Sequence, residues 1–107
     1  MSLKWPNKDP DETVDFSVDW SRYLNNQGTI DTVTWFVENA SGVKTQFSAD
    51  GQIINNIQLV GSSKTDTVAT INLGLGTNNF KYKFSCQILD TTGTVAERTI
   101  VLPIKEN

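Results

Sequence analysis

The sequence contains no histidine and only one cysteine, Cys86, among its 107 residues. Without histidine the chain cannot form a Ser-His-Asp or Cys-His catalytic arrangement or a histidine-based zinc site. A single cysteine also excludes a disulfide within the chain. No apolar run reaches the roughly 20 residues that a membrane-spanning helix requires. Lysine and arginine number 9 against 12 aspartate and glutamate residues, and the resulting charge of −3 argues against non-specific binding to nucleic acid.

The first residues do not predict a secretion signal. Residues 1–6 carry no apolar core of the kind that a signal peptide needs. A secreted domain of this size often uses disulfides to supplement a small core, and none can form here. We therefore expect a protein that is made in a cytoplasm, with no cofactor and with neither a membrane nor nucleic acid as a partner.

What the sequence does contain is alternation with a period of two. From position 14 onward, Val14, Phe16 and Val18 are apolar and the residues between them are polar. This pattern is typical of a strand with one buried and one exposed face. The same alternation recurs in further segments, one of which contains a bend or bulge at Asn55-Asn56. The predicted strands are 14–20, 32–38, 43–47, 53–60, 67–73, 80–88 and 99–105.

About seven short strands with Gly, Asn, Asp and Ser between them predict an all-β fold. Two antiparallel sheets packed face to face bury alternating residues from both, so we predict an Ig-like β-sandwich over residues 14–107. A small closed barrel is the alternative. The one helical signal is a single turn at 21–25. Tyr82 departs from antibody-type domains, because it precedes the cysteine by four residues where the tyrosine corner expects two.

Residues 1–13 predict an extended N-terminal arm. They hold two of the three prolines, Pro6 and Pro10, which bias the residues before them toward extended conformations. Because few of their side chains are able to pack, we expect deletion of residues 1–12 to leave a folded sandwich. Trp5 is the exception: it either folds back onto the sandwich or anchors the arm on a neighbouring subunit.

Each candidate catalytic or metal-binding site has a simpler structural explanation. One cluster of acidic residues offers oxygen ligands for a metal such as Ca²⁺, but it lacks the spacing of an EF-hand. Two of its members lie on the exposed face of a predicted strand, where nothing indicates a cleft for acid–base catalysis. The alternation of its strand places Cys86 on the inward face between apolar residues, so we predict an inert thiol in the core. We therefore predict neither catalytic nor metal-binding residues. The acidic cluster consists of Asp9, Asp11, Glu12, Asp15 and Asp19.

The N-terminal motif resembles that of a known family. Residues 5–12 read Trp-Pro-Asn-Lys-Asp-Pro-Asp-Glu, followed by Asp-Phe at 15–16, Asp-Trp at 19–20 and a leucine at 24. This pattern is similar to that of small phage and prophage structural proteins of the phage fiber-tail adaptor type. A turn and strand at 93–98 are similar to the C-terminal part of those proteins. The resemblance implies a non-enzymatic virion protein, located in a tail or neck, that docks on other virion proteins or on further copies of itself.

On this interpretation the arm supplies the docking groups, together with the sheet edges. Trp5 would provide most of the binding energy, and Asp9, Asp11 and Glu12 would set the register through charge pairs. The alternative is an Ig-like adhesion or carbohydrate-binding module of a bacterial surface protein. Such a sugar-binding domain would show exposed aromatic residues, whereas most aromatic residues here are predicted to face inward. A small enzyme comes third, because the composition offers it almost no catalytic material.

Overall fold

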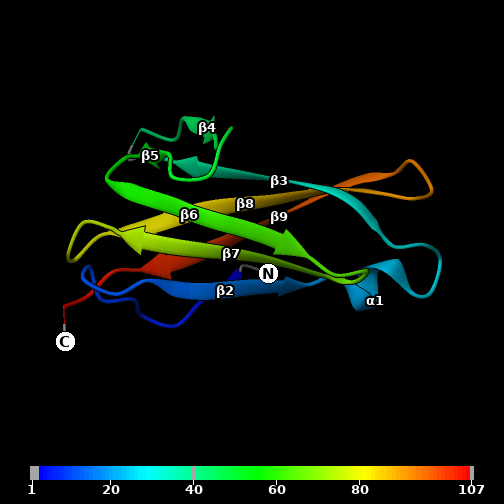
Figure 1. Ribbon diagram of the computed structural model, residues 1–107, viewed down its shortest axis with the longest axis horizontal. Helices are drawn as coiled ribbons and strands as arrows, with labels where there is room; N and C mark the ends of the chain where they lie inside the picture. Colours follow the sequence, from blue (N-terminus) through cyan, green and yellow to red (C-terminus); the bar gives the residue numbers. More distant parts are fainter. Residues whose placement is uncertain (1–2, 40, 107) are drawn as a thin grey trace.

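The computed structural model describes residues 3–39 and 41–106, which form two β-sheets packed face to face (Figure 1). One helical turn, α1 (Ser21–Leu24), lies between the second and third strands, as predicted. No helix in the described ranges is both long and apolar enough to cross a membrane. The strands are β1 (Leu3–Lys4), β2 (Val14–Asp19), β3 (Ile30–Glu38), β4 (Lys44–Gln46), β5 (Ile53–Ile54), β6 (Ile57–Lys64), β7 (Val68–Leu75), β8 (Lys81–Asp90) and β9 (Val95–Pro103).

The strand order is that of an Ig-like sandwich. One sheet runs β1-β9-β8-β3-β4 and the other runs β2-β7-β6-β5. All neighbouring strands are antiparallel except β1, which runs parallel to β9. The C-terminal hairpin pairs with β3, while β2, β6 and β7 form the opposite sheet, as in the immunoglobulin arrangement. The predicted Ig-like β-sandwich is confirmed, and the two separate sheets in the described residues exclude a closed barrel.

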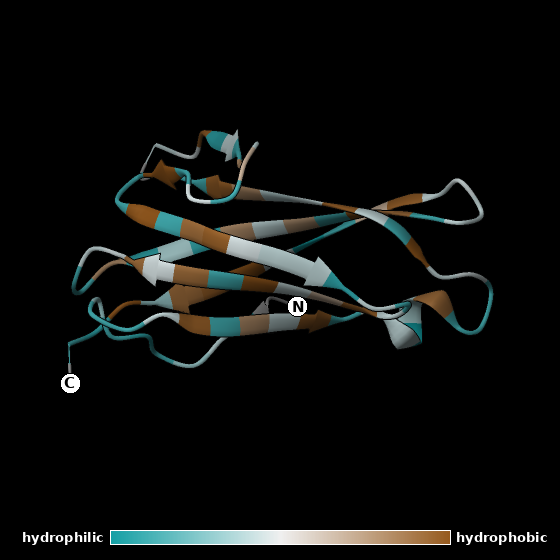
Figure 2. Ribbon diagram, in the orientation of Figure 1, coloured by the Kyte–Doolittle hydropathy of each residue, from teal (hydrophilic) through white to brown (hydrophobic). Residues whose placement is uncertain are grey.

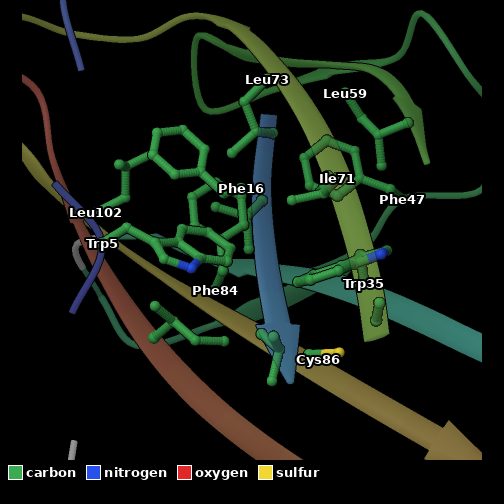
Figure 3. Packing of buried hydrophobic residues seen from close by; sticks show 14 of the residues in the cluster. Trp5, Phe16, Trp35, Phe47, Leu59, Ile71, Leu73, Phe84, Cys86 and Leu102 are labelled. Carbon is green, nitrogen blue, oxygen red and sulfur yellow. The ribbon is translucent and has the colours of Figure 1, made fainter. Parts of the chain in front are cut away.

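The core lies between the sheets and follows the predicted alternation. Along β2 the apolar and polar residues alternate visibly (Figure 2). In β8, Phe84, Cys86 and Ile88 are fully buried, and the backbone of Cys86 pairs with that of Trp35 on β3. The thiol is therefore a core group, as predicted, and belongs to the buried cluster that Figure 3 shows.

Several predicted strands differ in their bounds: β6 continues to Lys64, and β9 begins at Val95 and ends at Pro103. The segment 53–60 is broken by a two-residue turn, because Asn55 and Asn56 both adopt positive φ values of 55° and 66°, which suit a tight hairpin. The segment 43–47 is shorter than predicted and forms an edge strand with all three residues exposed. Its Val43 is 57% exposed, so the inward face expected there reduces to Phe47. Because β4 pairs with only three residues of β3, it covers little of the core.

Tyr82 performs the task of a tyrosine corner despite its different spacing from the cysteine. Its hydroxyl accepts a hydrogen bond from the backbone N–H of Thr77, five residues upstream, at 3.1 Å. It also donates to the carbonyl oxygen of Asn55 at 2.7 Å, which joins the β5–β6 turn to the β7–β8 connection. The departure predicted from the sequence is therefore one of spacing only.

Candidate docking surface

Trp5 packs in cis, against its own sandwich. Its side chain is 8% exposed, and its ring stacks on Phe16 of β2 with 4.9 Å between ring centroids (Figure 3). The indole Nε1–H donates to the carbonyl oxygen of Ser17 at 3.1 Å, and the backbone N–H of Trp5 donates to Val101 on β9 at 2.9 Å. Trp5 thus contacts both sheets at once.

The expectation that residues 1–13 add little to the core is therefore wrong for their described part. Pairing of β1 with β9 places the Trp5 side chain between the sheets, and the extended conformation that Pro6 favours continues the segment along β9. The Trp5 side chain is consequently not available as a surface anchor. The division between residues 13 and 14 stays a prediction about independent folding.

Lys8 is fully buried, although lysine is rarely buried without a partner. Its backbone N–H donates to Pro103 at 3.0 Å, and its carbonyl accepts from Lys105 at 2.9 Å. Its ammonium group donates to the carbonyl oxygens of Asp9, at 2.8 Å, and Leu75, at 2.6 Å. Burial lowers the pKa of Lys8, and the negative charges of Glu12, Asp9 and Asp11 oppose this effect. The side chain therefore clamps the N-terminal segment to the end of β7.

Asp9, Asp11 and Glu12 form a tight acidic turn. The N–H of Asp11 donates to the carboxylate of Asp9 at 2.8 Å, and the N–H of Asp9 donates to the carboxylate of Glu12 at 3.3 Å. The Asp11 and Glu12 side chains are exposed, and Asp9 is half-buried. The turn is thus held by its own hydrogen bonds above the Lys8 charge, and it presents two carboxylates to solvent. Whether the three acidic residues contact a partner stays a prediction.

The other two acidic residues of the cluster lie apart from this turn, on the exposed face of β2. Asp19 accepts a hydrogen bond from the N–H of Ser21 at 2.9 Å at the start of α1, and this bond lowers the pKa of its carboxyl group. Asp15 is the other exposed member. In the part of the chain that the structure describes, no three Asp, Glu, Cys or His residues are grouped so that they could hold a metal ion.

The motif in residues 5–24 consists mainly of core residues, so it describes how the chain packs more than how it docks. Its Trp5, Lys8, Phe16, Trp20 and Leu24 are all buried. The exposed motif residues are mainly its carboxylates. Sequence reasoning missed the burial of Lys8, because a lysine among acidic residues has the composition of a solvated surface. The proline on each side was the available signal that this segment follows a defined path.

Comparison with known proteins identifies the same type of family that the motif resembles. The family model of the podophage GP4 fiber-tail adaptor protein gp77 matches residues 8–103, which is nearly the whole chain. The matched range contains the Lys8 clamp, the acidic turn and strands β2 to β9. No curated protein matches the chain.

Proposed function

Because the chain belongs to the family of the podophage GP4 fiber-tail adaptor protein gp77, we propose that it is a non-enzymatic structural protein of a bacteriophage or prophage tail. In this role it joins tail and fiber components by binding other virion proteins, and it acts as part of the assembled particle. The family match over residues 8–103 is the observation that carries the proposal. The Ig-like sandwich is compatible with this role, because its rigid sheets hold exposed surfaces in fixed positions for binding other proteins.

The buried aromatic residues favour this role over a carbohydrate-binding module. Trp5, Trp20 and Trp35 are 8%, 1% and 3% exposed, so none of the three forms a flat platform on which a sugar ring could stack. The exposed carboxylates of Asp11 and Glu12 are better suited to charge pairing with a basic protein surface. Pairing of this kind sets orientation and association rate more than affinity.

The docking role of the acidic turn is tested with purified tails assembled without this protein. We expect the double variant Asp11→Asn/Glu12→Gln to fold as the parent does and to co-sediment with tails less well, most clearly at low salt. The variant Asp15→Asn is the matched control, because its side chain is exposed on β2 away from the turn. Equal co-sedimentation of both variants would show that the docking surface lies elsewhere. If the parent protein itself does not associate with tails, the adaptor role is wrong.

A further inference from the structure

Strand β3 has an unpaired stretch of edge. β4 pairs only with Phe36–Glu38, and one further bond runs from the N–H of Phe47 to the carbonyl of Trp35 at 3.0 Å. Ile30 is already engaged, because its N–H donates to Asp66 at 2.9 Å and its carbonyl accepts from Lys64. Within the described ranges, no strand lies on this side of residues 32–34. Because the backbone groups of a strand alternate in direction, the N–H and C=O of Val33 face the same open side as those of Trp35.

A hollow of about 150 Å³ lies beside this edge, between the two sheets. Trp35 is one of its lining residues, and the indole Nε1–H of this residue is buried without a hydrogen-bond partner among the described residues. In Figure 3 the nitrogen end of this ring points away from Trp5 and Phe16. A buried donor of this kind normally has an acceptor. The hollow is lined by Val33, Thr34, Trp35, Gln46, Phe47, Ser48, Ala49, Asp50, Leu59 and Ser62.

The opposite wall of this opening is also an edge. β5 pairs with Ile57 and Gln58 alone, so residues 61–64 of β6 have no second strand neighbour in the part of the chain that is described. At the far end, the ammonium group of Lys64 donates to the carbonyl of Ile30 at 3.1 Å and links the two sheets. The opening is thus closed at one end by Lys64 and at the other by the bond from Phe47 to Trp35.

Two exposed carboxylates lie along the opening, and the positive charge of Lys64 lies at its closed end. Asp50 lines the hollow and Asp31 directly precedes the open part of β3, and both side chains are exposed. Natural sheets usually protect such edges with lysine, proline or a covering loop. Here the ammonium group of the nearby Lys64 is engaged by a backbone carbonyl. An incoming chain with basic side chains would therefore find complementary charges at this edge.

We propose that the open edge of β3 is a strand-addition site, which receives a short, extended, basic segment of another virion protein. The segment pairs through its backbone with Val33, as in other cases of β-strand addition. An inward side chain with a hydroxyl or amide oxygen enters the hollow and accepts the hydrogen bond from Trp35. A lysine or arginine of the same segment lies near Asp50 or Asp31. This inference rests on the adaptor role and names the site and the chemistry of its partner.

The test uses the full chain and purified tails assembled without it. Val33→Pro removes the N–H that faces the open side and leaves the ladder to β8 intact, because that N–H does not point toward β8. Lys44→Pro is the matched control: its N–H faces the outer edge of β4, since Val43 and Phe47 direct their backbone groups toward β3. Trp35→Phe removes the buried donor and keeps an aromatic ring. Melting curves establish that each variant is folded.

We expect incorporation of Val33→Pro to fall by at least about tenfold, that of Trp35→Phe to fall by less, and that of Lys44→Pro to stay within about twofold. Hydrogen exchange of the parent protein bound to tails should show new protection of the Val33 and Trp35 amides, which face the open side, whereas the amides of Thr32 and Thr34 already lie in the ladder with β8. This measurement decides the matter if a variant does not fold. Parent-like incorporation of a folded Val33→Pro, or no new protection of the Val33 and Trp35 amides, would overturn the proposal and leave a hollow that holds only water. Failure of the parent to bind tails would instead overturn the adaptor role.

Discussion

At the scale of single residues, Cys86 shows how position in a strand determines chemistry. It is fully buried opposite Trp35, and burial raises the pKa of the thiol to about 12. The thiolate is the reactive form, so at neutral pH the folded chain presents almost none of it. The thiol therefore acts as a small apolar group in the core.

We predict that Cys86→Ser lowers the free energy of unfolding by about 1–3 kcal/mol, because a hydroxyl costs more than a thiol to bury in this largely apolar core. Denaturant unfolding measures the change. In the parent protein, a thiol reagent should react with Cys86 only as fast as the chain unfolds. Reaction at the rate of a free peptide cysteine would show that the thiol is accessible in the folded state.

Lys8 is the second residue whose environment makes a sharp prediction. Lys8→Met keeps the length of the side chain but leaves the carbonyls of Asp9 and Leu75 without its hydrogen bonds. We expect the free energy of unfolding at neutral pH to fall by about 1–3 kcal/mol. Lys81→Met is the control, because this lysine is exposed on β8. An unchanged or higher stability of Lys8→Met would mean that the cost of burying the charge outweighs its hydrogen bonds.

The same residue predicts a dependence on pH. Burial lowers the pKa of Lys8 in the folded chain below its ordinary value of 10.5. Between the lowered pKa and 10.5 the unfolded chain binds more protons than the folded chain, so this group makes stability rise with pH over that alkaline range. The parent should therefore gain stability relative to Lys8→Met as the pH increases toward 10.5. Denaturant melts at several pH values compare the two, and parallel profiles would contradict the expected gain.

At the scale of elements, the strands were predictable because their information is local. The alternation in β2, β7, β8 and β9 predicts both their existence and their buried face, and Asn55-Asn56 marks the break between β5 and β6. β1 was not predictable. It has two residues and exists only because β9, almost a hundred positions later, lies beside it. A two-residue strand that forms only beside a distant partner shows no alternation in its own sequence.

The end of β7 contains local strain. Leu75 adopts φ = 59°, a left-handed conformation that is unfavourable for a bulky residue, and its side chain is 45% exposed. We predict that Leu75→Gly raises the free energy of unfolding by about 0.5–1 kcal/mol, since the relief of strain exceeds the entropic cost of glycine. Thermal melting measures the shift.

Asn79→Gly is the matched control for this strain. Asn79 has a similar φ of 63°, but asparagine tolerates that region, so the variant should gain less stability than Leu75→Gly. A loss of stability in Leu75→Gly would show that the contacts of the Leu75 side chain outweigh the strain at its backbone.

At the scale of the whole molecule, the N-terminal segment links the two sheets. β1 extends the sheet that contains β9, while Trp5 stacks on Phe16 and donates to Ser17 in the other sheet. The prolines predicted the extended path of this segment, but no local pattern shows which surface an extended chain follows. The fold class was therefore predictable from the sequence. The cis packing of Trp5 and the burial of Lys8 required the assembled structure.

The structure changes the expected effect of truncation. Deletion of residues 1–12 removes Trp5 from the core, the pairing of β1 and the Lys8 clamp. Loss of the tryptophan alone should cost about 3–5 kcal/mol, which is a large part of the 5–15 kcal/mol that stabilises a typical domain. We therefore predict that the truncated chain is at least as unstable as Trp5→Ala. Circular dichroism melts of the two variants beside Asp11→Asn/Glu12→Gln, which keeps every buried group, provide the comparison. A truncated chain that melts within a few degrees of the parent would restore the independent sandwich of residues 14–107 and the free arm.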